Sequence, residues 1–100
     1  MAMLHTVNES PFETKTLESC IGLAKSGSTV LLIEDGVYAA TANNSVADMI
    51  KNASGINFCV LGPDAQARGI EGKLADGIKV VDYAGFVDLV TEHDSVQAWL

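Results

Sequence analysis

The chain has 100 residues, of which 48% are hydrophobic, and a formal net charge of -7 at pH 7. This length suits a single domain, residues 1–100, and no stretch reaches the ~20 consecutive apolar residues of a bilayer-spanning helix. The six lysines and arginines are scattered, so no basic patch is expected to bind nucleic acid directly.

The first residues lack the charged and apolar regions of a secretory signal, and we expect a cytoplasmic protein. Cys20 and Cys59 are far apart, with no CxxC spacing and no neighbouring histidine pair. This pattern predicts reduced thiols and no metal site.

A first strand is expected over Met3–Val7. Ser10 as cap, Pro11 at the first helical position and Glu13 as the closing residue predict that a helix begins there. Gly27 is expected to end this helix, whose buried stripe would be Leu17, Cys20, Ile21 and Ala24.

The apolar run Val30 to Ile33 is typical of a strand covered on both faces. Ser45 to Asp48 has the form of a capping box, which predicts a second helix ending near Gly55. Its apolar residues at helical spacing are Val46, Met49, Ile50 and Ala53. Asn57–Leu61 is the expected third strand.

A short helix is expected over Asp64 to Arg68 and a fourth strand over Ile78 to Val81. Asp82 is a candidate cap for a last helix that ends near Glu92, and the tail from Val96 is expected as an edge strand or a docking arm. The buried stripe of that helix would be Tyr83, Phe86, Val87 and Val90. The alternation predicts an α/β protein, a three-layer α/β/α sandwich with a mostly parallel sheet of four or five strands.

Ligands of such sheets bind at the carboxyl ends of the strands. The loops expected there contain no GxGxxG, Walker lysine or flavin phosphate cradle, so no nucleotide or other cofactor is expected. The acidic residues and lysine of a phosphoacceptor receiver domain are also missing. Glu34 and Asp35, which precede Gly36, could be paired carboxylates, but a turn formed by Asp-Gly is the favoured interpretation.

Cys20 is the one candidate catalytic nucleophile, because a thiolate can accept sulfane sulfur and pass it on as a persulfide. Its place on the apolar stripe favours core packing, and it lies about ten residues beyond the expected cap, too far for the helix dipole to activate it. Cys59, His5 and His93 are interpreted as packed or structural residues.

Several blocks, in this order and over nearly the whole chain, resemble the TusB/DsrH family. They are Met3-Leu4-His5-Thr6, Ser10-Pro11, Glu34-Asp35-Gly36-Val37, Ala39-Ala40, Ala67-Arg68-Gly69, Asp82-Tyr83, Phe86-Val87, Leu89 and Trp99. The resemblance implies a DsrE-like fold and a persulfide sulfur-relay complex, a heterohexamer with DsrE/TusD-like and DsrF/TusC-like subunits that serves a DsrC/TusE-like sulfur carrier.

The resemblance also places the principal sulfur-carrying cysteine in the DsrE/TusD-type subunit. Cysteine at position 20 looks like the DsrH version of the family. This resemblance favours a role in oxidative sulfur metabolism over one in 2-thiolation of the tRNA wobble uridine. The expected role is an accessory, docking subunit with Cys20 as a secondary sulfur site. The alternatives are an enzyme that uses Cys20 and a homo-oligomeric DsrE-like binding module without sulfur transfer. Tyr38, Phe86 and Trp99 are candidate interface anchors, with packing in this domain's own core as the alternative.

Overall fold

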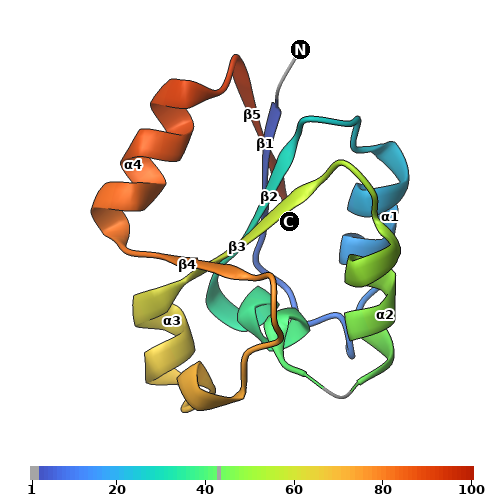
Figure 1. Ribbon diagram of the computed structural model, residues 1–100, viewed down its shortest axis with the longest axis vertical. Coiled ribbons are helices and arrows are strands. Elements are labelled where there is room, and N and C mark those ends of the chain that lie inside the picture. Colours follow the sequence, from blue (N-terminus) through green and yellow to red (C-terminus); the bar gives the residue numbers. More distant parts are fainter. Residues whose placement is uncertain (1–2, 43) are drawn as a thin grey trace.

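The strands form one five-stranded parallel sheet, and the computed structural model describes residues 3–42 and 44–100 (Figure 1). The strand order is β4-β3-β2-β1-β5, so the last strand lies beside the first. The strands are β1 (Met3–Val7), β2 (Thr29–Leu32), β3 (Asn57–Leu61), β4 (Lys79–Val81) and β5 (Ser95–Trp99). This confirms the predicted α/β class.

The helices lie in layers on both faces of the sheet: α1 and α2 on one face and α4 on the other (Figure 1). The helices are α1 (Thr16–Leu23), α2 (Ser45–Asn52), α3 (Gly62–Ala67) and α4 (Tyr83–Glu92), and the short 3-10 helices are η1 (Glu34–Ala40) and η2 (Glu71–Lys73). Strands β1 to β4 follow one direction across the sheet, and the chain then returns to β5 on the far side of β1. Because parallel crossovers are right-handed, this reversal carries α4 to the opposite face.

Each face of the sheet has its own buried cluster, since side chains alternate along a strand. The larger cluster lies under α1 and α2 and includes Leu17 and Cys20. The smaller one lies under α4 and consists of Leu4, Leu31, Cys59, Leu61 and Val81, with Phe86 and Leu89 packed against it. All four residues of β2 are buried, as expected for a strand covered on both faces.

The predicted start of the first helix at Ser10 is wrong. The Ser10 carbonyl accepts hydrogen bonds from the amides of Glu13 and Thr14, and its hydroxyl accepts from the Phe12 amide at 3.2 Å. These bonds close an isolated turn, and α1 begins only at Thr16 and ends at Leu23, before Gly27. The buried stripe nevertheless includes Leu17 and Cys20, as predicted.

Smaller differences concern helix and strand ends. Asn44, rather than Ser45, caps α2, because its side-chain oxygen accepts from the amides of Val46 and Ala47 at 2.9 Å each. Helix α3 begins two residues earlier than predicted, at Gly62, with Pro63 in its first turn, where a missing amide donor costs nothing. The strands β2 and β4 are shifted by one residue at one or both ends.

The predicted buried stripe of the last helix is largely wrong. Asp82 caps α4 as expected, through the Gly85 amide at 2.8 Å. Tyr83, Val87 and Val90 are exposed, however, and only Phe86 of the stripe packs against the sheet. Helical spacing in the sequence cannot show how many helices cover a face of the sheet. Here α4 covers its face alone, so no neighbouring helix buries the outer flank of α4.

Candidate functional site

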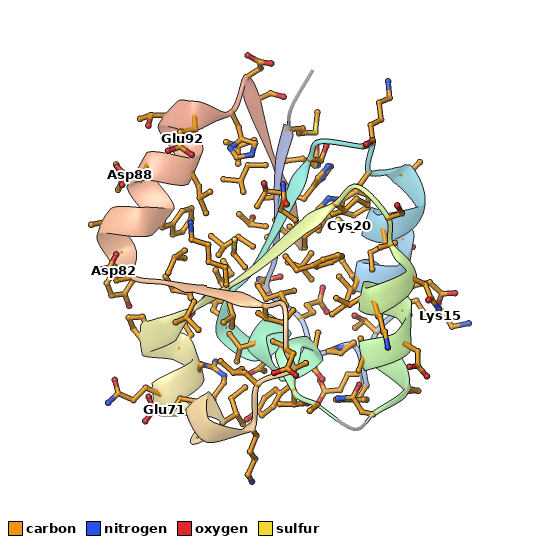
Figure 2. The ribbon with its side chains drawn as sticks, in the orientation of Figure 1. Lys15, Cys20, Glu71, Asp82, Asp88 and Glu92 are labelled. Atoms are coloured by element: carbon orange, nitrogen blue, oxygen red, sulfur yellow. The ribbon has the colours of Figure 1, made fainter. Side chains whose placement is uncertain are left out.

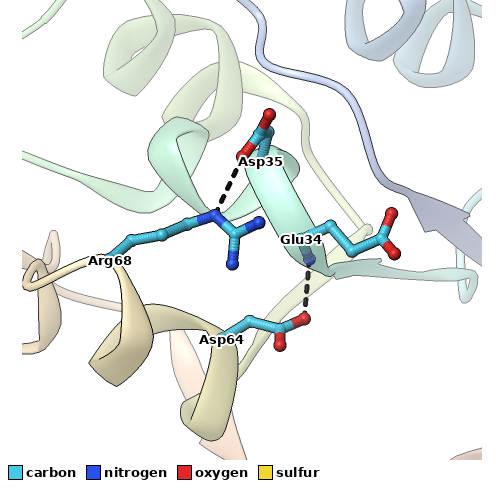
Figure 3. Close-up of polar contacts among 4 residues, drawn as sticks. All are labelled: Glu34, Asp35, Asp64 and Arg68. Carbon is cyan, nitrogen blue, oxygen red and sulfur yellow. Dashed lines mark hydrogen bonds and ion pairs between the residues drawn. The ribbon is translucent and has the colours of Figure 1, made fainter.

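The carboxyl ends of β2 and β3 carry a cluster of charged side chains (Figure 3). Arg68, just beyond α3, pairs with Asp35 through Nε and Oδ1 at 2.9 Å. Asp64, in the first turn of α3, accepts the Glu34 amide at 2.7 Å. Two of the sequence blocks that carry the family resemblance therefore meet in space here. No sequence spacing could have predicted this pairing, because the partners are 33 positions apart.

The Glu34-Asp35-Gly36 segment forms a tight turn at the entry to η1. The Gly36 amide donates to the Ile33 carbonyl at 2.8 Å, and Glu34 has a positive φ of 49°. Asp35 forms an ion pair with Arg68. The hydrogen bond between the two side chains is the largest cause of the raised pKa of Arg68. The turn interpretation thus describes this segment better than a proton-sharing carboxylate pair does.

Cys20 lies on the buried side of α1, against the larger core cluster (Figure 2). Its side chain is 0% exposed, and burial raises the pKa of the thiol to about 11. Because α1 begins at Thr16, Cys20 lies five residues beyond the Lys15 cap, or roughly 7.5 Å along the axis, and the dipole effect fades within the first turn. In this conformation burial disfavours the thiolate, which is the nucleophilic form of the group.

Cys59 is buried on the other face of the sheet. Burial raises the pKa of its thiol, and the nearby Lys79 ammonium opposes that shift. Since Cys20 and Cys59 belong to different clusters, the sheet separates the two thiols and they cannot act as a redox pair.

The two histidines are held by hydrogen bonds at opposite ends of the chain. Nδ1 of His5 accepts from the indole Nε1 of Trp99 at 3.0 Å, and burial lowers the pKa of His5. His93 contacts the Leu89 carbonyl through Nδ1 at 2.7 Å and the Thr29 hydroxyl through Nε2 at 2.9 Å. Both imidazoles have hydrogen-bond partners and act as structural residues, as the sequence predicted. Which residues they would bond to was not foreseen.

The predicted interface anchors are also partly internal. Tyr38 and Trp99 pack against the larger core cluster, and Phe86 packs against the smaller one.

Among the described residues, no group of three or more His, Cys, Asp or Glu side chains could hold a metal ion. The described helices include none with the length and apolarity to cross a membrane.

Solved structures with the same architecture define the class of protein. YchN from Escherichia coli superposes with a TM-score of 0.82, covering 98% of each chain at 16% identity. A protein of unknown function from Methanobacterium thermoautotrophicum superposes with a TM-score of 0.72, covering 96% of each chain at 17% identity. At these identities the likeness establishes the fold, a small α/β protein with a five-stranded parallel sheet.

Sequence comparison identifies the family within that class. The model of the family described as "DsrH like protein" matches residues 9–96. Protein TusB from Escherichia coli K12 is 37% identical over 97 residues, which cover 97% of this chain and 100% of that protein. The chain belongs to the DsrH-like family, and the TusB/DsrH resemblance found in the sequence is confirmed.

Proposed function

We propose that this chain is an accessory subunit of a cytoplasmic sulfur-relay complex, in which persulfide sulfur passes from protein to protein. Its partners would be DsrE/TusD-like and DsrF/TusC-like subunits in a heterohexamer, together with a DsrC/TusE-like carrier. The observation that carries the proposal is family membership over nearly the whole chain. Full-length similarity to TusB favours the branch that leads to 2-thiolation of the tRNA wobble uridine.

The accessory role is supported by the state of Cys20. Accepting sulfur requires a thiolate whose Sγ attacks the sulfane sulfur of a donor persulfide, so that a new S–S bond forms and the donor thiolate leaves. A fully buried thiol with a pKa of about 11 supplies neither the anion nor the approach. Cys20 is therefore at most a secondary site that needs an opening of α1, and the principal sulfur-carrying thiol belongs to another subunit.

A second candidate is the oxidative branch of sulfur metabolism. It is favoured by one feature, the presence of a cysteine at position 20, which resembles the DsrH version of the family. The same docking role and the same partners apply, with a DsrC-like acceptor in place of the tRNA-directed carrier.

Deletion of the gene in its own bacterium tests the branch. Loss of the 2-thio group from wobble uridines, measured by mass spectrometry of tRNA nucleosides and restored by the wild-type gene, is expected for the tRNA branch. Unchanged 2-thiouridine together with impaired oxidation of reduced sulfur would overturn that choice in favour of the second candidate. If neither phenotype appears, the sulfur-relay proposal fails.

Intact-mass spectrometry tests the role of Cys20. The purified chain is exposed to a persulfide donor, alone and with its partner subunits, beside the Cys20→Ser and Cys59→Ser variants. We expect no added sulfur on the isolated chain. Added sulfur that disappears only in Cys20→Ser would make this subunit a carrier and contradict the accessory role.

A further inference from the structure

The last strand of the sheet is held to the rest of the chain by few interactions. β5 lies at an edge of the sheet and pairs with β1 alone, and its first four residues are exposed. Among the described residues, the hydrogen bond from Trp99 to His5 is the only one that joins a β5 side chain to another element. Trp99 is also the residue of this strand that packs against the larger core cluster. A segment with few buried apolar contacts opens at a lower free energy than the core does.

The end of α4 is fixed at a second point, just before β5 begins. Nδ1 of His93 donates to the Leu89 carbonyl at 2.7 Å, so Nε2 of the neutral ring accepts from the Thr29 hydroxyl of β2 at 2.9 Å. Thr29 is buried, and Leu89 packs against the smaller core cluster. Asp94 alone separates His93 from Ser95, where β5 starts, and the chain reverses direction there (Figure 1). An opening that starts in β5 therefore reaches a fixed residue before it reaches the helix.

The two histidines respond differently to a proton. Nδ1 of His5 accepts from the indole of Trp99, which is only a donor, so a protonated His5 cannot keep this bond. In His93, Nδ1 already donates to a carbonyl, and a protonated Nε2 can donate to the Thr29 hydroxyl, which is both a donor and an acceptor. Acid is therefore expected to break the bond that holds β5 and to preserve the bond that holds the end of α4.

The surroundings of His5 are uncharged. Its neighbours in the register are Val30 on β2 and Gln97 on β5. The helix over this face, α1, turns Leu17 and Cys20 toward the sheet, and Cys20 is the titratable residue of the two. Burial is the only cause that lowers the pKa of His5 from 6.5, so no charged side chain of the described residues acts on it. The bond to the indole is thus intact at neutral pH and is lost only below pH 6.5.

We propose that β5 is a detachable strand, which opens from β1 as a unit about Asp94 while the other four strands stay folded. The Trp99–His5 bond controls the opening, and the His93–Thr29 bond confines it to residues 95–100. The open form uncovers the outer edge of β1 and releases a tail that contains the tryptophan, and acid favours this form. The property belongs to the isolated chain and does not depend on the proposed function.

Hydrogen exchange of the native chain at several low urea concentrations, followed residue by residue by NMR, tests the proposal. We expect the hydrogen-bonded amides of β5 to exchange at least about tenfold faster than those of β2 and β3. Their rates should depend little on urea, because a local opening exposes little surface. Equal rates and an equal urea dependence for β5 and β2 would show that β5 opens only when the whole chain unfolds, which overturns the proposal.

Two variants separate the two bonds. Trp99→Phe removes the indole donor, and we expect about tenfold faster exchange of β5 at low urea, as for the loss of one hydrogen bond to a buried group. Gln97→Ala, an exposed change on the same strand, is the matched control and should exchange like wild type. Thr29→Val keeps the shape of the side chain without the hydroxyl, so the amides in the last turn of α4 should exchange as fast as those of β5. If they stay slow, the bond of His93 does not confine the opening and this part of the proposal is overturned.

Trp99 is the single tryptophan, and its fluorescence reports on the response to acid. Between pH 8 and pH 5 we expect the emission to shift to longer wavelength while the far-ultraviolet circular dichroism of the helices is retained. His5→Gln should show no such shift, since an amide oxygen accepts from the indole at every pH. Loss of both signals together would mean that acid unfolds the whole chain, and a constant emission in wild type would mean that the bond survives. Either result contradicts the proposed response to acid.

Discussion

Trp99 and His5, which are 94 positions apart, are joined by a hydrogen bond of 3.0 Å from the indole Nε1 to the imidazole Nδ1. The bond connects the last strand to the first, and the two rings lie with their centroids 6.1 Å apart. Trp99 is also packed against the larger core cluster. The residue that the sequence suggested as an interface anchor therefore fastens the edge of the chain's own sheet.

Replacing Trp99 with Phe is expected to destabilise the fold. The change leaves the buried His5 acceptor without its partner, which costs about 1 to 3 kcal/mol of unfolding free energy. Urea unfolding followed by far-ultraviolet circular dichroism measures the loss, with Gln97→Ala, an exposed substitution on the same strand, as the control. Equal midpoints for Trp99→Phe and wild type would show that the bond contributes nothing.

The same pair predicts a pH dependence of stability. Burial lowers the pKa of His5 below its ordinary value of 6.5, so the unfolded chain binds a proton more readily than the folded one. The stabilising contribution is present above pH 6.5 and is lost as the pH falls from 6.5 through the folded pKa, because protonated Nδ1 cannot accept from the indole. Unfolding free energies measured between pH 8 and pH 5 are expected to fall more steeply for wild type than for His5→Gln. Parallel curves would contradict this assignment.

Cys20 is expected to resist alkylation in the isolated native chain. Burial raises the pKa of the thiol to about 11, so little thiolate is present at neutral pH, and burial also slows the approach of the reagent. Iodoacetamide labelling of the Cys59→Ser variant, with and without urea, isolates this thiol. Native labelling as fast as unfolded labelling would mean that α1 opens readily. Faster labelling in the presence of the proposed partner subunits would give Cys20 a role in the proposed complex.

Gly36 is expected to tolerate no side chain. A Cβ at this position would collide with the backbone carbonyl of Val7, which cannot move without disturbing β1. Gly36→Ala should therefore cost about 1 to 3 kcal/mol of stability. Gly22→Ala is the matched control, since a Cβ there meets nothing within 4 Å and alanine is the better helix former by about 0.5 to 1 kcal/mol. Thermal midpoints that move in opposite directions would support the prediction, and a neutral Gly36→Ala would refute it.

The fold was largely predictable because its signals are local. The strand Asn57–Leu61, with its apolar run from Phe58, and the Asp82 cap are short patterns whose meaning does not depend on distant residues, and both predictions are confirmed. The start of α1 was missed because Ser10 and Pro11 serve an isolated turn as well as they would serve a helix. The strand order was not predictable, since nothing near Trp99 indicates that its neighbour is β1.

The candidate site was less predictable than the fold. The sequence singled out Cys20 and described its apolar setting correctly, but whether this thiol carries sulfur stays a prediction. The pairing of Arg68 with Asp35 depends on how α3 lies against η1, which no spacing encodes. The exposure of Val87 depends on how many helices cover one face, which is a property of the topology and not of helical periodicity.

The pairing of β5 with β1 also has a consequence for folding. The two strands are neighbours in the sheet, although their paired residues lie at distant positions in the chain. A long loop must close before this contact forms, and contacts of this kind slow folding. Until β5 has paired, β1 exposes an unpaired strand edge, the kind of group that promotes aggregation.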